Sequence, residues 1–405
     1  MIANLPLLSS RHGRRLLLSS SSRSRCHPSL PPSRPPTRSP AALAGGVRGY
    51  RAGALFPGQG DQYAGMADGA AGCPRRSELY ARARGVLGYD LAAACRSEDS
   101  VHHTAVSQPA MYVAGLAAAY GEVGGAEIHG DERDAGDERV ARGSERSRGT
   151  GERGERGEPG GSAGTSETSG AAGDLAASAF SVAAAQVDVA CGLSLGEYTA
   201  LAFAGSVSFE AGLRLVRARG EAMQAASELE PSGMVSVTGL GRGECEALCA
   251  AACAAAGLPI GAGDLVIANV LGPQQFVLSG AEEACSHLER LAPLAGARSA
   301  KKLRVSGAFH SKFMAPAAPA LAAALAEADF APPRVPVLGN VDAAPHSTDP
   351  DPEVRGALIR GRLLAQLTSP VLWADILDQV VVPKEFERAV VYGPGRQVNR
   401  VCVRD

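Results

Sequence analysis

The stretch VDVACGLSLGEYTALAFAG, residues 187–205, joins a short apolar run to an apolar segment with helical spacing. Between the two, Ser194 lies two residues from Gly192 on one side and two residues from Gly196 on the other. The pattern predicts a buried strand before Ser194, a tight turn at it and a helix after it. Glycines at the two flanking positions allow a sharp turn and a close approach of the helix to the sheet. We therefore expect Ser194 at a helix N-terminus, where backbone N–H groups are free.

Ser194 is either a nucleophile on this turn or a serine without a chemical role, since chance produces the pattern easily in a chain with 49 glycines. A serine nucleophile needs a general base, and histidine is the usual one. Among the eight histidines, His310 follows a predicted strand directly, in a turn with Gly307 and Ser311. By residue type alone, His310 is either this base or a structural histidine. The other seven stand in segments that predict no such turn: His12, His27, His102, His103, His129, His287 and His346.

The composition predicts a folded protein that neither binds nucleic acid nor spans a membrane. The chain has 405 residues, 45% of them hydrophobic, and a net charge of −2. This length accommodates two or three domains of ordinary size, and the balanced charge argues against a nucleic-acid-binding protein. The sequence holds no run of about 18 or more apolar residues, so no membrane span is expected.

The nine cysteines form no CxxC pair, and three of them recur every fourth residue: Cys245, Cys249 and Cys253. This spacing places the three near one face of a helix. A metal site would need a further ligand close by, and His287 is a distant candidate. A buried stripe of small apolar side chains is the favoured interpretation. We therefore expect reduced thiols, no metal site and no cofactor.

Residues 1–50 have the composition of an organellar transit peptide. No Asp or Glu occurs before Asp61, while Arg, Ser and Pro are frequent. The segment lacks the compact apolar core of a secretory signal. Its Ser and Pro content favours a plastid (the chloroplast stroma), with the mitochondrion second and a basic tail without a targeting role as the remaining alternative.

Residues 124–173 mix charges of both signs with glycine and hold almost no large apolar side chain. Such a segment cannot bury enough surface to offset the entropy of ordering it. We predict a disordered low-complexity insertion at the surface. A docking loop is the alternative interpretation.

Predicted strands and helices follow one another in the order βαββαβ from about Ser232 to Val305. This order is that of the ferredoxin-like arrangement. We therefore predict a small ferredoxin-like domain over residues 227–305, inserted into a larger one.

Strands and helices also alternate on both sides of this region, which predicts a large α/β domain in two parts, residues 51–226 and 306–405. Gly220 is an unusual residue inside a predicted helix, where it allows close packing or the approach of a ligand. The predicted strands include residues 335–341 and 387–395, and the predicted helices include residues 77–95, 107–122, 209–224, 353–367 and 373–382.

The sequence resembles the malonyl-CoA:acyl carrier protein transacylases of type II fatty acid synthesis over about Gly53 to Arg400. Several separated motifs occur in the order of that family. They are FPGQG at 56–60, SQPA at 107–110, GLSLGEYTA at 192–200, RGEAMQ at 219–224, SGAFHSKFM at 306–314, QLTSPV at 366–371 and GPG at 393–395. The resemblance implies an α/β-hydrolase-like large domain with an inserted ferredoxin-like small one, as the pattern also predicts.

The resemblance implies a ping-pong transfer of a malonyl group from malonyl-CoA to the phosphopantetheine thiol of acyl carrier protein, which supplies fatty acid synthesis. Ser194 would attack the thioester and become malonylated. His310 would take the serine proton and later give it to the leaving thiol, oriented by the backbone carbonyl of Gln366 rather than by a carboxylate. The backbone N–H groups of Gln59 and Leu195 would form the oxyanion hole.

Arg219 would pair with the free carboxylate of the malonyl group, because its planar guanidinium matches a carboxylate with two hydrogen bonds. The alternative for Arg219 is a solvated charge on a helix, as expected for Arg214 and Arg217. The resemblance implies malonyl-CoA and acyl carrier protein as partners, and we expect a monomer.

The chain departs from the family pattern at four places. Leu193 stands where many members carry His, Asp61 replaces a common Ser, and Leu372 stands where an Arg often follows SPV. No acidic residue precedes Gly393 directly. None of these departures removes a residue to which the resemblance gives a catalytic role.

A serine esterase or thioesterase on a similar scaffold is the alternative function. Such a hydrolase usually has an acidic third residue late in the chain, which is not evident here, and it has no use for Arg219. A non-catalytic relative is the third possibility. The presence of Ser194, His310, Gln59 and Arg219 together argues against it.

Overall fold

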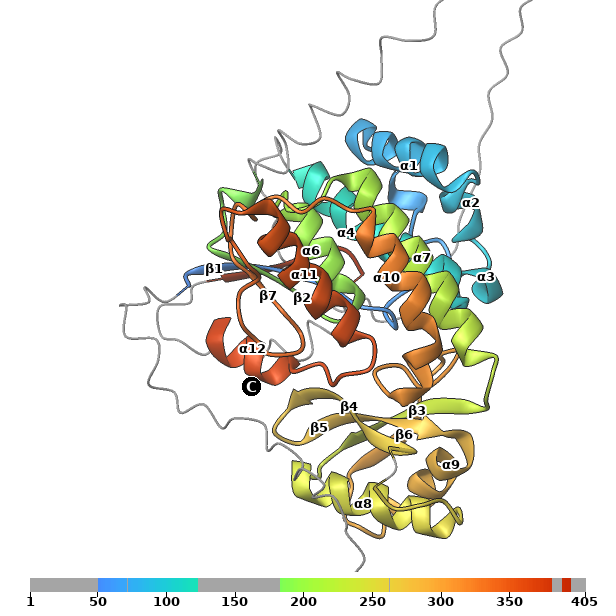
Figure 1. Ribbon diagram of the computed structural model, residues 1–405. Helices are drawn as coiled ribbons and strands as arrows, with labels where there is room; N and C mark the ends of the chain where they lie inside the picture. The colour runs from blue at the N-terminus through green and yellow to red at the C-terminus, as the bar shows by residue number, and fades with distance from the viewer. Residues whose placement is uncertain (1–49, 71, 123–182, 262, 381–387, 395–405) are drawn as a thin grey trace, which may run out of the picture. The chain divides into compact units, whose positions relative to one another are not determined.

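The large part of the chain is built on a parallel sheet of four strands in the order β7-β2-β1-β8. Figure 1 shows the computed structural model, which describes residues 50–70, 72–122, 183–261, 263–380 and 388–394. Every strand pair of this sheet is parallel, and the residues of its central pair are almost all buried. The strands are β1 (Ala52–Phe56), β2 (Val189–Gly192), β7 (Val337–Leu338) and β8 (Arg388–Val391).

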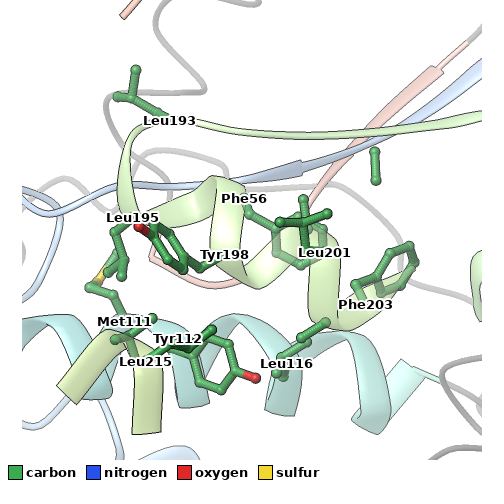
Figure 2. Packing of buried hydrophobic residues seen from close by; sticks show 14 of the residues in the cluster. Phe56, Met111, Tyr112, Leu116, Leu193, Leu195, Tyr198, Leu201, Phe203 and Leu215 are labelled. Atoms are coloured by element: carbon green, nitrogen blue, oxygen red, sulfur yellow. The ribbon is translucent and has the colours of Figure 1, made fainter. Parts of the chain in front are cut away.

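Helix α6 runs from the carboxyl end of β2 and packs between the sheet and helix α4. In Figure 2, Leu195 of α6 lies beside Met111 of α4. The α-helices of this part are α1 (Pro74–Leu87), α2 (Leu91–Ala94), α3 (Glu98–His102), α4 (Thr104–Glu122), α6 (Leu195–Phe203), α7 (Phe209–Ser227), α10 (Ala318–Ala326), α11 (Pro352–Gln366) and α12 (Trp373–Val380), with short 3-10 helices at η2 (Asp68–Ala70) and η3 (Lys312–Ala317).

The single helix predicted over residues 77–95 is wrong, because the chain forms two helices there. Gly88 adopts a left-handed conformation with φ 79° and ends α1, and its N–H donates to the Arg84 carbonyl. Asp90 then caps the N-terminus of α2 by accepting from the Ala93 N–H. The glycine was visible in the sequence as a helix stop.

The smaller part is an antiparallel sheet in the order β4-β5-β3-β6, covered by two helices. This order confirms the predicted ferredoxin-like arrangement, and the sheet has its own apolar cluster. Cys245, Cys249 and Cys253 are buried in that cluster, as the spacing predicted, and burial raises the pKa of the Cys249 thiol to about 12. The elements are β3 (Ser232–Thr238), α8 (Arg242–Ala255), β4 (Leu265–Gly272), β5 (Gln275–Ala281), α9 (Glu282–Leu291) and β6 (Ser299–Lys302).

The small sheet is hydrogen-bonded to the segment that follows α11. The Val270 N–H of β4 donates to the Val371 carbonyl at 2.9 Å, and the Val371 N–H donates to the Ala268 carbonyl at 2.8 Å.

The domain boundaries at residues 226–227 and 305–306 stay predictions. Residues 1–49 of the predicted leader and the predicted insertion over 124–173 lie outside the described residues. In the part of the chain that the structure describes, no helix combines the length and apolar character that crossing a membrane requires.

Candidate active site

Ser194 sits in the turn between β2 and α6, with φ 54° and ψ −105°. The flanking glycines leave no room for a side chain. A Cβ on Gly192 would lie 1.9 Å from the Gly196 backbone, and a Cβ on Gly196 would lie 2.2 Å from the Phe56 carbonyl oxygen. The predicted strand, sharp turn and helix are therefore confirmed, and the turn presents Ser194 at the first turn of α6.

Ser194 and His310 form a hydrogen-bonded pair. The Ser194 Oγ lies 2.7 Å from the His310 Nε2, and the His310 Nδ1 lies 2.9 Å from the backbone carbonyl oxygen of Gln366. Because a carbonyl only accepts, Nδ1 carries the proton and Nε2 is left to accept from the serine hydroxyl. The arrangement is that of a nucleophile with its base and an orienting group.

The electrostatic environment keeps His310 neutral. Burial and the nearby positive charge of Arg219 lower the pKa of His310 to about 4, and hydrogen bonds with the backbone of Gln366 and Ser369 oppose this shift. A neutral imidazole at pH 7 is the form that can accept the serine proton.

Arg219 lies on α7 and is only 1% exposed, so it is not a solvated charge. Its Nη1 donates to the Gln108 Oε1 at 2.9 Å, and its Nη2 donates to the Gln366 Oε1 at 3.0 Å and to the Ser194 Oγ at 3.2 Å. Within the described ranges, its Nε has no hydrogen-bond acceptor and no carboxylate lies in salt-bridge distance of the guanidinium. A buried cation without an anion beside it is costly, which makes this position suited to an anionic ligand.

A pocket of about 180 Å³ opens beside these groups, between the parallel and the antiparallel sheet. Ser194, His310, Arg219 and Gln59 all line it. The antiparallel sheet contributes apolar and polar side chains to the opposite wall: Met234, Asn269, Leu271 and Val277. A pocket lined from both sheets in this way has room for a small acyl group beside Ser194.

The two residues predicted for the oxyanion hole differ in position. Gln59 lines the pocket, and its side-chain Nε2 donates to the Thr104 Oγ1 at 3.2 Å. Leu195 follows the serine as the first residue of α6 but does not line the pocket. In the described segments, neither backbone N–H donates to a protein acceptor. Their role in binding an oxyanion stays a prediction.

Of the three substituted positions that depart from the family pattern, one lines the pocket beside the serine and two do not. Leu193 is buried and lines the pocket, so its apolar side chain stands next to Ser194. Asp61 is buried between Gly60 and Gln62, which both line the pocket, and Leu372 packs against the apolar cluster of the small sheet.

Three polar residues near Ser194 were missed by sequence reasoning: Glu197, Asn340 and His346. Asn340 accepts from the Ser194 backbone N–H at 2.6 Å, and Glu197 lies 2.7 Å from the His346 Nε2. Asn340 lies two residues after the end of β7, and polar residues at the carboxyl ends of parallel strands commonly meet at one edge of the sheet. That signal was present in the sequence. No comparable signal pointed to His346.

Gly220 explains how α7 brings Arg219 to the pocket. A Cβ on Gly220 would lie 2.9 Å from the Thr104 carbonyl oxygen, so the glycine lets α7 pack closely against the start of α4. Close packing, one of the two predicted uses of this glycine, is therefore confirmed.

Residues 175–397 match the family described as "Acyl transferase domain". The chain is 32% identical over 357 residues to the human protein named malonyl-CoA-acyl carrier protein transacylase, mitochondrial, covering 86% of this chain and 75% of that protein. It is 31% identical to the Escherichia coli malonyl CoA-acyl carrier protein transacylase, over 86% of this chain and 91% of that protein.

Solved structures of the same family share the fold. The Coxiella burnetii malonyl CoA-acyl carrier protein transacylase superposes with a TM-score of 0.65 at 26% identity, covering 87% of this chain and 90% of that one. A malonyl-transacylase in complex with a type II polyketide acyl-carrier protein has a TM-score of 0.64 at 26% identity, covering 87% and 92%. With the serine–histidine pair in its strand–turn–helix setting, these similarities show that the chain belongs to the malonyl-CoA:acyl carrier protein transacylase family.

Proposed function

We propose that this protein transfers a malonyl group from malonyl-CoA to the phosphopantetheine thiol of acyl carrier protein, through a malonyl ester on Ser194. One observation carries the proposal: the Ser194 Oγ lies 2.7 Å from the His310 Nε2 and 3.2 Å from the Nη2 of the buried Arg219. The first distance fits acyl transfer. The second fits an acyl group that bears a negative charge.

In the acylation step, the His310 Nε2 takes the proton of Ser194 while Oγ attacks the thioester carbonyl. The backbone N–H groups of Gln59 and Leu195 stabilise the negative charge that develops on the carbonyl oxygen, a contribution of about 2.7–4 kcal/mol for each donor in comparable sites. His310 then gives its proton to the departing CoA sulfur. Deacylation repeats these steps in reverse order, with the carrier thiol as the nucleophile.

Arg219 binds the free carboxylate of the malonyl group. Once the ester has formed, this carboxylate is separated from the Ser194 Oγ by the ester carbonyl and one methylene group, which is compatible with the position of the guanidinium. The carboxylate also neutralises the charge that lowers the pKa of His310. A malonyl substrate therefore makes His310 a stronger base, whereas an uncharged acyl group does not.

Hydrolysis as the main reaction is disfavoured by the partner of the base. His310 is oriented by the carbonyl oxygen of Gln366, whereas serine hydrolases generally use a carboxylate. A non-catalytic role is disfavoured by the intact hydrogen bond between Ser194 and His310.

The test is incubation of the protein with labelled malonyl-CoA in the absence of an acceptor, followed by peptide mapping. We expect the label on the peptide that contains Ser194 and none on the Ser194→Ala variant. A chase with holo acyl carrier protein should remove the label faster than a chase with buffer. Absence of label would overturn the proposal, and equal loss in both chases would favour the hydrolase.

We further propose that residues 1–50 direct the protein to a plastid, on the basis of their Ser, Pro and Arg content. The named human relative is mitochondrial, so the mitochondrion is the competing destination. A fluorescent protein fused to residues 1–50 distinguishes the two. We also propose that the protein acts as a monomer, since one chain supplies every residue of the proposed site.

A further inference from the structure

Four buried polar side chains near Ser194 have no role in the proposed mechanism. One of the four residues, Gln366, takes part only through its backbone carbonyl, which accepts from His310. Each is at most 2% exposed. Buried polar groups persist when they are hydrogen-bonded, and a connected network holds its members in one arrangement. The four, which we name the Glu197 cluster, are Glu197, Asn340, His346 and Gln366.

Glu197 is the centre of the cluster. Its Oε1 lies 2.7 Å from the His346 Nε2, which must donate because a carboxylate only accepts. Its Oε2 accepts from the Gln366 Nε2 at 2.6 Å and from the Asn340 backbone N–H at 3.0 Å. Both carboxylate oxygens are therefore occupied by donors from other segments of the chain.

The neighbours of Gln366 permit one orientation of its side-chain amide. On one side, the Glu197 carboxylate and the Ser194 carbonyl can only accept, so the amide nitrogen faces them at 2.6 and 3.0 Å. On the other side, the Arg219 guanidinium can only donate, so the amide oxygen faces it at 3.0 Å. A flipped amide would place an N–H group against a cation and an oxygen against an anion.

Residues of the cluster are hydrogen-bonded to Arg219, His310 and Ser194. Gln366 accepts from Arg219 through its side chain and from His310 through its backbone carbonyl. Asn340 accepts from the Ser194 N–H at 2.6 Å and donates from its Nδ2 to the Gly192 carbonyl at 2.8 Å, which holds both sides of the turn.

We propose that Glu197, anchored by His346, is a positioning residue that sets the amide orientation of Gln366 and thereby aims Arg219 at the acyl carboxylate. This inference rests on the proposed function. It adds that selection of the charged acyl group depends on a carboxylate that touches neither the substrate nor the serine side chain.

The first test is a double-mutant cycle on the ratio of kcat/KM for malonyl-CoA to kcat/KM for acetyl-CoA. Glu197→Met and Gln366→Met keep the length of each side chain and remove its polar end, and the backbone carbonyl that orients His310 remains. Each variant should lower the ratio on the order of tenfold, because a hydrogen bond to a charged group is lost. The double variant should lower it no further than Gln366→Met alone, since one residue acts through the other.

The matched control is Gln379→Met. The Gln379 amide donates to the Ala343 carbonyl at 2.8 Å and makes no contact with the cluster. This control should leave the ratio unchanged. If the cluster has a purely structural role, each variant will lower kcat/KM for malonyl-CoA and for acetyl-CoA by the same factor and leave their ratio unchanged. That result would overturn the proposal.

The second test uses His346 and applies even if Glu197→Met fails to fold. His346→Gln keeps a nitrogen donor near Glu197, whereas His346→Met removes it. We expect His346→Gln to retain the acyl preference and His346→Met to lose part of it. Equal ratios in the two variants would overturn the anchoring role.

The proposed function is tested separately by malonylation of wild-type Ser194. If the wild type forms no malonyl ester, the proposed function fails. If the ester forms and the ratios do not change in the variants, only the positioning role fails.

Discussion

Arg219 and His310 influence each other through their charges. Burial and the Arg219 guanidinium lower the pKa of the His310 imidazole, and the guanidinium also donates to the Ser194 hydroxyl. Arg219 is itself deprived of solvent, and burial lowers its pKa as well. A substrate carboxylate placed beside Arg219 relieves both effects. Under the proposed function, acyl selection by Arg219 and the basicity of His310 are therefore linked.

Replacing Arg219 by Ala should change the acyl preference. Malonyl-CoA differs from acetyl-CoA by one carboxylate, and an unpaired charge in a closed site typically costs about 2–5 kcal/mol. The ratio of kcat/KM for malonyl-CoA to that for acetyl-CoA should fall on the order of 10²-fold or more. Arg214→Ala is the control, because Arg214 lies exposed on the same helix. An equal fall for both thioesters would refute the malonyl assignment.

The pH profile should report the lowered pKa of His310. The native imidazole stays neutral until the pH approaches about 4, rather than the ordinary 6.5. The kcat/KM for malonyl-CoA should therefore stay level as the pH falls through 6.5 and decline only toward about 4. In Arg219→Ala, the acidic limb of acetyl transfer should move to higher pH, because the neighbouring positive charge is absent.

The same shift has a consequence for stability. Between pH 6.5 and about 4, the unfolded chain binds a proton at His310 that the folded protein does not. The contribution of neutral His310 to stability is therefore present above 6.5 and is lost as the pH falls toward 4. Circular dichroism at each pH separates loss of fold from loss of activity. If kcat/KM for malonyl-CoA already declines near pH 6.5 while the wild type remains folded, the assignment of His310 as the base is contradicted.

At the scale of elements, the site depends on the close approach of backbones. Gly196 is required because the turn after β2 passes close to the end of β1, and Gly192 is required because the first turn of α6 lies against it. Helix α7 reaches the pocket because Gly220 lets it approach α4. Ser194 and His310 both have positive φ values, 54° and 59°, although neither is a glycine. Strained backbone of this kind persists where the surrounding structure holds it, and here it carries the two side chains to which we assign the nucleophile and the base.

Substituting Gly196 by Ala should disrupt the turn. The new Cβ would lie 2.2 Å from the Phe56 carbonyl oxygen, so β1 and α6 would have to separate. We expect a loss of stability of about 1–3 kcal/mol and a fall in Ser194 acylation on the order of 100-fold, since small displacements of a nucleophile are costly.

Gly85→Ala is the control for this substitution. Gly85 lies inside α1, and a Cβ there would meet no atom within 4 Å. That variant should be as active as the wild type and more stable by up to about 1 kcal/mol. Thermal unfolding and the acylation rate are the measurements. An active, stable Gly196→Ala would contradict the structural account of the turn.

At the scale of the whole described chain, the pocket exists because two sheets meet. The turn at the end of the parallel-sheet strand β2 supplies Ser194, the segment after the antiparallel sheet supplies His310, and the antiparallel sheet supplies the opposite wall of the pocket. The hydrogen bonds between Val371 and β4 join the small sheet to the segment that follows Gln366. The position of the base thus depends on how the two sheets are joined.

Deleting residues 124–173 should leave folding and malonyl transfer largely intact. The reason is compositional, since the segment has almost no large apolar residue with which to contribute to a core. Soluble yield, melting temperature and formation of the malonyl ester are the measurements, with the full chain as the reference. A collapse in yield or a large fall in melting temperature would show that the segment belongs to the folded protein.

Local patterns in the sequence were sufficient to predict most of the elements and to single out Ser194 and His310 as candidates, whereas their proposed roles came from the family resemblance. The strand, turn and helix around Ser194 followed from apolar runs and two glycines, and the βαββαβ order followed from alternating periodicities. These features depend on near neighbours in the chain, so they are visible without the fold. The predicted bounds were less accurate, as at β7, which has two residues where seven were expected.

The Glu197 cluster was decided by the tertiary structure. Glu197 is 149 residues from His346 and 169 from Gln366 in the sequence, so no local spacing relates them. The motifs identified Gln366 by its backbone carbonyl, whereas the fold also gave its side chain a position between a carboxylate and a guanidinium. A buried polar group must find its partner, and which partner it finds depends on which distant segments the packing of the two sheets brings together.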